Sequence, residues 1–283
     1  MIRFDFNSSE SISWIKRVCE IRHTPVAIGE DILFAFDNLD LKDCAPEHVA
    51  TLACLIEHFS SLRHRVLIDK SPVGLFLWEK CRLRQYWGGR QNYSESPDET
   101  ILNLWRINVN EKDLHGTSVT AYLKNKYFKH KDLSAVANSL TEAYYNVFDH
   151  ADAQGNAFSM LMYNQETEVL RVAVCDFGKG IARTVKDFLK VDIRDSEAIG
   201  RAIQTDFSIK SKEYNAGLGL KNICDCCTER DSLHIVGNSG AVCIENGCSR
   251  YTDLGFSFGG TLIFYSISLS HFEDEEIIND FNL

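Results

Sequence analysis

The chain has 283 residues, of which 45% are hydrophobic and 25% are charged. This balance is typical of a folded globular chain of one large or two modest domains, and it excludes a fibre or a disordered chain. Forty acidic against thirty basic residues give a formal net charge of -10. That sign is wrong for wrapping nucleic acid or lying on an anionic membrane, so we expect neither as a main partner.

The first ten residues, Met1 to Glu10, contain no continuous apolar stretch. A signal peptide or a membrane-spanning segment needs such a stretch, so the sequence predicts a cytoplasmic protein. In that compartment the 10 cysteines are expected to be reduced thiols rather than disulfides.

The early part of the chain predicts alternating strands and helices from its apolar periodicity. In chain order these elements are the strand Ile32–Phe36, the helix Pro46–Leu62, the strand Arg65–Asp69 and the helix Val73–Leu83. The segment Tyr86–Thr100 that follows is rich in glycine and serine, a composition typical of a connection. We therefore expect a small α/β domain over residues 1–93 and a second domain over residues 94–283.

The second domain is expected to mix helices with strands. Its elements are a strand at Ile101–Val109, a helix at Leu114–Phe128, a helix opened by Asp132 or Ser134 and running to Phe148, strands at Ala157–Tyr163 and Val169–Cys175, a helix from Leu218, and strands at Leu233–Val236, Ala241–Glu245 and Gly260–Leu269. The polar run Ser208–Asn215 suits a surface loop, and Glu273–Asp280 suits a solvated acidic terminus.

Three polar residues recur at steps of four on the helix that runs to Phe148, namely Glu142, Asn146 and His150. This spacing places their side chains on one flank of the helix, beside its apolar stripe. A carboxylate there can accept a proton from an attacking hydroxyl or water, and an amide oxygen can join the shell of a magnesium ion. A solvated helix flank would show the same pattern.

The motif Asp176-x-Gly178-x-Gly180-Ile181 directly follows an apolar strand. A buried carboxylate at this strand end would accept a hydrogen bond from the exocyclic amine of adenine and would repel a base with an acceptor at that place. The glycines permit a tight turn and a close approach to a ligand. An ordinary β-turn would show the same motif.

Two further glycine motifs follow. Residues Gly217 to Leu220 open a predicted helix, where free backbone N–H groups and the helix dipole favour an anion such as phosphate. Residues Phe258 to Thr261 precede a long apolar strand, and the Thr261 hydroxyl would add to a base-binding network. Each motif alone is compatible with an ordinary turn or helix start.

Taken in this order and with these intervals, the four elements resemble the N box, the two glycine boxes and the terminal Gly-Thr box of the Bergerat-fold ATPases. That superfamily includes gyrase, a heat-shock chaperone ATPase, histidine kinases and mismatch-repair ATPases. The likeness covers roughly Asp132 to Leu269. It implies an α+β fold, a two-layer α/β sandwich, that binds ATP and Mg²⁺.

The resemblance also implies a role for each matching residue. Glu142 would be the general base, Asn146 the magnesium ligand and Asp176 the adenine reader. The run Ser208–Asn215 would form an ATP lid, and His150 would be either a lid contact or a polar helix end. The other nucleotide-binding residues implied are Gly178, Gly180, Ile181, Lys210, Gly217, Leu218, Gly219, Leu220 and Thr261.

Within the superfamily, the spacing of Glu142, Asn146 and His150 is most similar to that of the anti-sigma-factor serine kinases. Val147 departs from the alanine that is typical there, and its bulk beside the magnesium ligand points to the alternative of binding without turnover. Residues 26–83 resemble the STAS domain of anti-sigma-factor antagonists, although the loop Asp43–Pro46 offers no serine for phosphorylation. A small α/β domain that simply packs on the ATPase half is the other interpretation.

The resemblance implies an ATP- and magnesium-binding regulatory switch with ATPase or serine-kinase-like activity and a regulatory protein partner. The resemblance also admits a homodimer. One alternative is a nucleotide-gated protein-interaction module with negligible turnover, and another is a structural adaptor that binds no nucleotide.

The group Cys224, Cys226 and Cys227, with Cys243 and Cys248 later in the chain, raises the hypothesis of a zinc site. Structural zinc sites favour two residues between paired thiolates on a tight turn. The first three cysteines instead lie on a predicted helix and point in different directions. We therefore expect reduced thiols.

Overall fold

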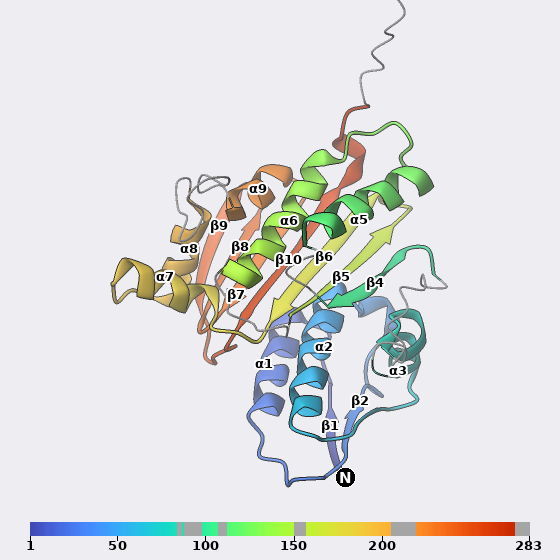
Figure 1. Cartoon of the computed structure of the whole chain (residues 1–283), viewed down its shortest axis with the longest axis vertical. Coiled ribbons are helices and arrows are strands. Elements are labelled where there is room, and N and C mark those ends of the chain that lie inside the picture. Colours follow the sequence, from blue (N-terminus) through green and yellow to red (C-terminus); the bar gives the residue numbers. More distant parts are fainter. Residues whose placement is uncertain (84–86, 88–97, 107–111, 150–156, 205–218, 275–283) are drawn as a thin grey trace, which may run out of the picture.

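A computed structural model describes residues 1–83, 87, 98–106, 112–149, 157–204 and 219–274. The chain forms two β-sheets of different kinds, with helices packed against both (Figure 1). The α+β class predicted from the sequence is confirmed.

Residues 1–83, which we call the N-terminal unit, form a parallel three-stranded sheet in the order β1-β2-β3. Its elements are β1 (Ile2–Asp5), α1 (Ser11–Arg22), β2 (Ile32–Ala35), a 3₁₀ turn (Leu41–Asp43), α2 (Pro46–Ser61), β3 (Val66–Ile68), α3 (Pro72–Leu75) and a π-helical turn (Phe76–Lys80). The sequence prediction began at Ile32, so it missed β1 and α1. The helix predicted over Val73–Leu83 begins correctly beside Pro72 but changes to π geometry after one turn.

The remaining described residues form an antiparallel sheet in the order β4-β5-β6-β10-β7-β8-β9. The strands are β4 (Ile101–Arg106), β5 (Ala157–Asn164), β6 (Val169–Asp176), β7 (Ser232–Gly237), β8 (Gly240–Glu245), β9 (Cys248–Asp253) and β10 (Thr261–Ser268), and the helices are α5 (Lys112–Lys126), α6 (Ser134–Asp149), α7 (Ile181–Leu189), α8 (Asp195–Ile203) and α9 (Gly219–Cys226). Every side chain of β9 is exposed, which is why its sequence shows no apolar alternation and the prediction missed it. Within the described ranges, no helix combines the length and the apolar content needed to cross a bilayer.

Alternate residues of the central strands enter two separate cores, one on each face of the seven-stranded sheet. On the helical face, as we call it, Val172, Val174 and Ile263 pack with helices α5 to α9. On the opposite N-terminal face, Ala173 and Phe264 pack with the N-terminal unit. Because both faces are buried, these strands read as almost continuously apolar, and their sequence does not show which core a residue joins.

Helix α2 lies between the two sheets and packs against β5 and β6. The Sγ atom of Cys54 on α2 donates a hydrogen bond to the carbonyl oxygen of Cys175 on β6 at 3.3 Å. The N-terminal unit therefore reaches the end of β6, one residue before Asp176.

Candidate functional site

Asp176 and Thr261 lie side by side on the helical face, at the ends of two interior strands. β6 ends at Asp176 and β10 begins at Thr261, and the two residues are opposite each other in the antiparallel register. Both alternate with residues of the helical core, Val174 and Ile263, so their side chains point to the side of the sheet that carries α6. Their exposed fractions are 0% and 4%, so both polar side chains are buried.

The carboxylate of Asp176 has one paired oxygen and one unpaired oxygen. Oδ1 accepts a hydrogen bond from the backbone N–H of Gly178 at 2.7 Å, whereas Oδ2 has no hydrogen-bond partner among the described residues. Burial raises the pKa of Asp176 to about 7, although the Gly178 N–H, the backbone and hydroxyl of Thr261 and the charge of Arg22 oppose the rise. A buried acceptor without a donor is unfavourable, so Oδ2 marks the place where a ligand can supply a hydrogen-bond donor.

Gly180 and Thr261 also hold the turn after β6 in place. Gly180 has a φ of +85°, and a Cβ atom there would lie 2.5 Å from Asn238 Oδ1 and 2.8 Å from the carbonyl oxygen of Gly260. Thr261 Oγ1 accepts the backbone N–H of Ile181, the first residue of α7, at 3.0 Å. The hydroxyl that the sequence assigned to base binding therefore also caps a helix, and the Ile181 side chain belongs to the core.

Glu142 and Asn146 lie on the C-terminal half of α6 and face inward. Their exposed fractions are 8% and 7%, which excludes the solvated helix flank that the sequence left open. Asn146 Nδ2 donates a hydrogen bond to the carbonyl oxygen of Glu142 at 2.7 Å. Because Nδ2 is used within the helix, Oδ1 is the atom of this side chain suited to a cation.

Tyr144 connects the C-terminal half of α6 to the sheet. Its hydroxyl lies 3.1 Å from the Oγ atom of Ser159 on β5, and Ser159 is opposite Val174 on β6. Val174 precedes Asp176 by two residues, about 7 Å along the strand. The structure therefore brings the buried turns of α6 and the end of β6 together on the same face of the sheet.

Helix α9 runs antiparallel to α6. Cys226, at the C-terminal end of α9, donates through Sγ to the carbonyl oxygen of Ala135 in the first turn of α6 at 3.1 Å, and the two helices pack along each other. Gly219, at the N-terminus of α9, therefore lies toward the half of α6 that carries Glu142. The Leu220 side chain is buried in the helical core, so only its backbone can face a phosphate.

Four of the predicted binding residues lie outside the described residues, namely His150, Lys210, Gly217 and Leu218. The same holds for the predicted lid, Ser208–Asn215, and for the Val147 side chain. Their roles stay predictions.

Arg22 is a site residue that the sequence analysis missed. It lies in the last turn of α1 and donates from Nη1 to the carbonyl oxygens of Phe258 and Gly259 at 3.3 and 2.5 Å, and from Nη2 to that of Phe177 at 3.4 Å. Its guanidinium also stacks over the Phe177 ring, 4.1 Å from the ring centroid. One side chain of the N-terminal unit thus joins the loop after Asp176 to the loop before Thr261.

Replacing Arg22 with methionine is expected to lower the free energy of unfolding by about 1–2 kcal/mol, because three part-buried carbonyl groups lose a charged donor. A nucleotide beside Asp176, which the sequence resemblance predicts, is then expected to bind several-fold more weakly, since both loops beside Asp176 lose their common support. Chemical denaturation and nucleotide titration measure the two effects. Arg17→Met is the matched control, because Arg17 lies on the same helix but bonds within the N-terminal unit, to the Asp5 carbonyl. Equal nucleotide affinity in both variants would contradict the assignment.

Cys224, Cys226 and Cys227, at the end of α9, do not converge as a group of metal ligands among the described residues. Cys226 Sγ bonds to the Ala135 carbonyl and Cys227 Sγ to the Ile223 carbonyl, so the two thiols serve different partners. Burial raises the pKa of Cys226 to about 11, which disfavours a thiolate. All ten cysteines are free, as expected for reduced thiols.

Comparison of the chain with models of protein families and with curated proteins found no match. A fold class alone does not define an activity, so the function has to be argued from the site.

Proposed function

We propose that the chain binds ATP with Mg²⁺ on the helical face in the manner of the Bergerat-fold ATPases, and that it acts as a regulatory switch with ATPase or serine-kinase-like activity. The observation that carries this proposal is the fully buried Oδ2 of Asp176, which has no donor among the described residues. It lies at the end of an interior strand, on the same face of the sheet as the buried turns of α6.

The chemistry of Oδ2 favours adenine over other purines. The N6 amine of adenine is a donor that satisfies the carboxylate, and a hydrogen bond to a charged group contributes about 1.5–3 kcal/mol. A 6-oxo purine presents an acceptor at the same position and would meet the negative charge of Asp176. The site therefore supports an adenine nucleotide as its ligand.

The residues of α6 and of the N-terminus of α9 that lie on this face of the sheet suit the phosphate groups of that nucleotide. Asn146 Oδ1 fits a hard cation such as Mg²⁺, which when bound would neutralise phosphate oxygens. The N-terminus of α9 adds positive potential beside the same turns of α6. Glu142, one turn before Asn146, would accept a proton from water or from the hydroxyl of a protein substrate.

Calorimetric titration of the full chain with Mg²⁺ and ATP, ADP or ITP tests the proposal. We expect ATP and ADP to bind, and ITP to bind at least about tenfold more weakly because its O6 faces Oδ2. An absence of heat with ATP, or equal affinity for ATP and ITP, would overturn the proposal.

A second candidate function is a nucleotide-gated protein-interaction module with negligible turnover. Arg22 favours it, because this residue ties the loops beside Asp176 to the N-terminal unit and offers a direct route from nucleotide to that unit. In this version the N-terminal unit, which we propose to be STAS-like, presents the nucleotide state to a protein partner.

Replacing Glu142 with glutamine separates the two functions. If the protein is an ATPase or kinase, we expect phosphate release or transfer to fall by about 100-fold while nucleotide affinity stays nearly constant, since only the proton acceptor is lost. Phosphate release and transfer of label from γ-labelled ATP are the measurements. Asp132→Asn is the control, because Asp132 is an exposed carboxylate that caps the start of the same helix. No turnover in the unaltered protein would instead favour the gated module.

A further inference from the structure

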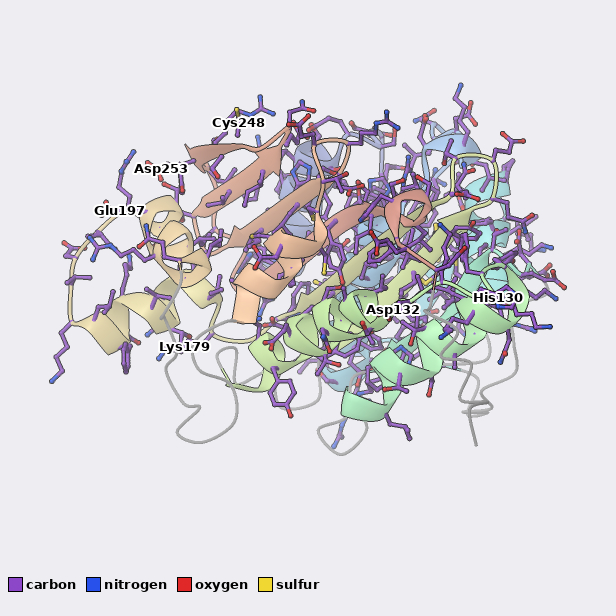
Figure 2. All side chains as sticks on the ribbon, turned by 90° about the horizontal axis from the view of Figure 1, so that it is seen from above. His130, Asp132, Lys179, Glu197, Cys248 and Asp253 are labelled. Carbon is purple, nitrogen blue, oxygen red and sulfur yellow. The ribbon has the colours of Figure 1, made fainter. Side chains whose placement is uncertain are left out.

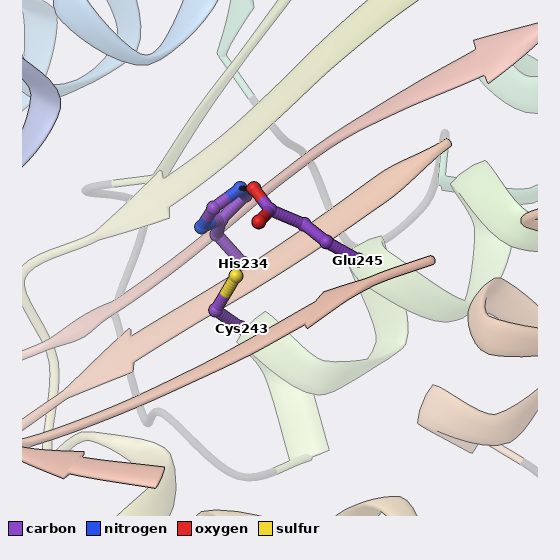
Figure 3. A group of neighbouring side chains, drawn as sticks. All are labelled: His234, Cys243 and Glu245. Atoms are coloured by element: carbon purple, nitrogen blue, oxygen red, sulfur yellow. Dashed lines mark ion pairs between the residues drawn. The ribbon is translucent and has the colours of Figure 1, made fainter. Parts of the chain in front are cut away.

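A second cluster of chemically reactive side chains lies on the opposite, N-terminal face of the sheet. His234 on β7 and Cys243 on β8 are directly opposite each other in the antiparallel register, and Glu245 follows two residues later on the same side of β8. Figure 3 shows the three side chains converging. One nitrogen, one sulfur and one oxygen atom of this cluster all lie within 4.8 Å of one another.

The cluster is held by contacts that fix the imidazole. The His234 ring stacks on Phe264 with the ring centroids 4.6 Å apart and the planes 4° from parallel. His234 Nε2 lies 3.4 Å from Glu245 Oε1. The backbones of the three residues are therefore held by neighbouring strands of the sheet. Small rotations of the Cys243 and Glu245 side chains are enough to change the distances between the three ligand atoms.

The surroundings of the cluster already favour a cation. Arg250, on the neighbouring strand β9, places Nη2 2.6 Å from Glu245 Oε2 and 3.7 Å from Cys243 Sγ. The carboxylate of Glu47 on α2 adds negative potential at His234 from the N-terminal unit. The Arg250 side chain is 70% exposed, so it can move into solvent if a metal ion takes its place.

We propose that His234, Cys243 and Glu245 bind a divalent transition metal ion of the Zn²⁺ type, with the fourth position open to water. Imidazole, thiolate and carboxylate are the three ligand types of zinc sites, and three protein ligands with an open fourth position is their reactive form. A tetrahedral ion needs its ligand atoms about 3.5 Å apart, so the atoms of the cluster, all within 4.8 Å of one another, have to approach by at most about 1.3 Å. The thiolate and the carboxylate together neutralise the two charges of the ion.

The site does not depend on the proposed nucleotide function. It lies on the N-terminal face, whereas Asp176 and the buried turns of α6 lie on the helical face.

Titration of the full chain with Co²⁺ tests this site. We expect one equivalent to bind and to give a sulfur-to-cobalt charge-transfer band together with tetrahedral d–d bands. Cys243→Ser is expected to abolish the charge-transfer band, and His234→Asn to weaken binding by about tenfold or more. Zn²⁺ added to the cobalt form should displace the ion and remove both bands.

Cys248 provides the matched control for unspecific thiol binding. It is an exposed cysteine on the outer strand β9 (Figure 2). In the β8–β9 register it is opposite Glu245. Cys248→Ser is expected to keep both the stoichiometry and the affinity within about threefold. Failure of the unaltered chain to bind Co²⁺, or a charge-transfer band that survives Cys243→Ser, overturns the proposal. So does a band that disappears in Cys248→Ser alone.

Discussion

Replacing Asp176 with asparagine is expected to reverse the purine preference of the protein from ATP to ITP. The Gly178 N–H donates to Oδ1, so the amide oxygen of the asparagine has to take the Oδ1 position. The amide nitrogen is then forced into the position of Oδ2, where an acceptor becomes a donor. That donor opposes the N6 amine of adenine and pairs with the O6 atom of hypoxanthine.

The change in preference should be large because the affinity for ATP falls while the affinity for ITP rises. Loss of a charge-assisted hydrogen bond weakens the binding of ATP by about 10–100-fold, and the new hydrogen bond to O6 strengthens the binding of ITP. We expect the ratio of the two affinities to change by about 10³-fold. Titration of both proteins with both nucleotides measures it.

Asp231→Asn is the matched control for this variant. Asp231 is also a buried aspartate, but its two oxygens are fully used by the backbone N–H groups of Thr228 and Ser268 and by the Thr228 hydroxyl. Its replacement should reduce stability and leave the preference for ATP unchanged. ATP binding by Asp176→Asn at the strength of the unaltered protein would contradict the role of Asp176.

Local sequence was sufficient to single out Asp176 as a candidate, because an aspartate follows an apolar strand and precedes a glycine turn, although an ordinary β-turn shows the same motif. It was not sufficient to show that Oδ2 lacks a partner, which depends on the packing of β10 against the end of β6. The spacing of Glu142 and Asn146 indicated one flank of a helix. That this flank is buried depends on the tertiary packing around α6, and the spacing alone does not show it.

Arg22 could not be found from sequence in the same way. Its carbonyl partners lie 155 to 237 residues away along the chain, and no local pattern links a helix end to loops at that distance. Helix α1 itself was within reach, since Trp14, Ile15, Val18 and Ile21 are buried at helical spacing.

The cluster of His234, Cys243 and Glu245 shows the importance of strand register. The sequence drew attention to Cys243 as one cysteine among several, whereas its partners are a histidine and a glutamate. Only the pairing of β7 with β8 places His234 opposite Cys243.

The nucleotide-free protein is expected to lose stability as pH rises, because the buried carboxyl group of Asp176 then loses its proton. Its folded-state pKa of about 7 lies above the ordinary value of 3.8, so the folded state holds a proton that the unfolded chain releases. This contribution is complete below about pH 4 and is lost as pH rises through 7. The buried carboxylate therefore costs on the order of 2–4 kcal/mol at pH 8.

Comparison of the unaltered protein with Asp176→Asn isolates this contribution. Burial lowers the pKa values of His48, His58, His115 and His234, and such histidines change stability with pH in the opposite direction. Their effects cancel in the difference between the unaltered protein and Asp176→Asn. We expect the variant to gain stability relative to the unaltered protein between pH 5 and pH 8, as measured by chemical denaturation at each pH.

The same ionisation should couple nucleotide binding to pH. The N6 amine of adenine favours the charged carboxylate, so ATP affinity is expected to tighten by about tenfold between pH 6 and pH 8 as Asp176 loses its proton. The bound nucleotide would then offset the cost of the buried charge, and the ligand should stabilise the fold most at the higher pH. Calorimetry in two buffers of different ionisation enthalpy measures the accompanying proton release. A pH-independent affinity, together with equal pH dependence of stability in Asp176→Asn, would show that this carboxyl group does not titrate in the site.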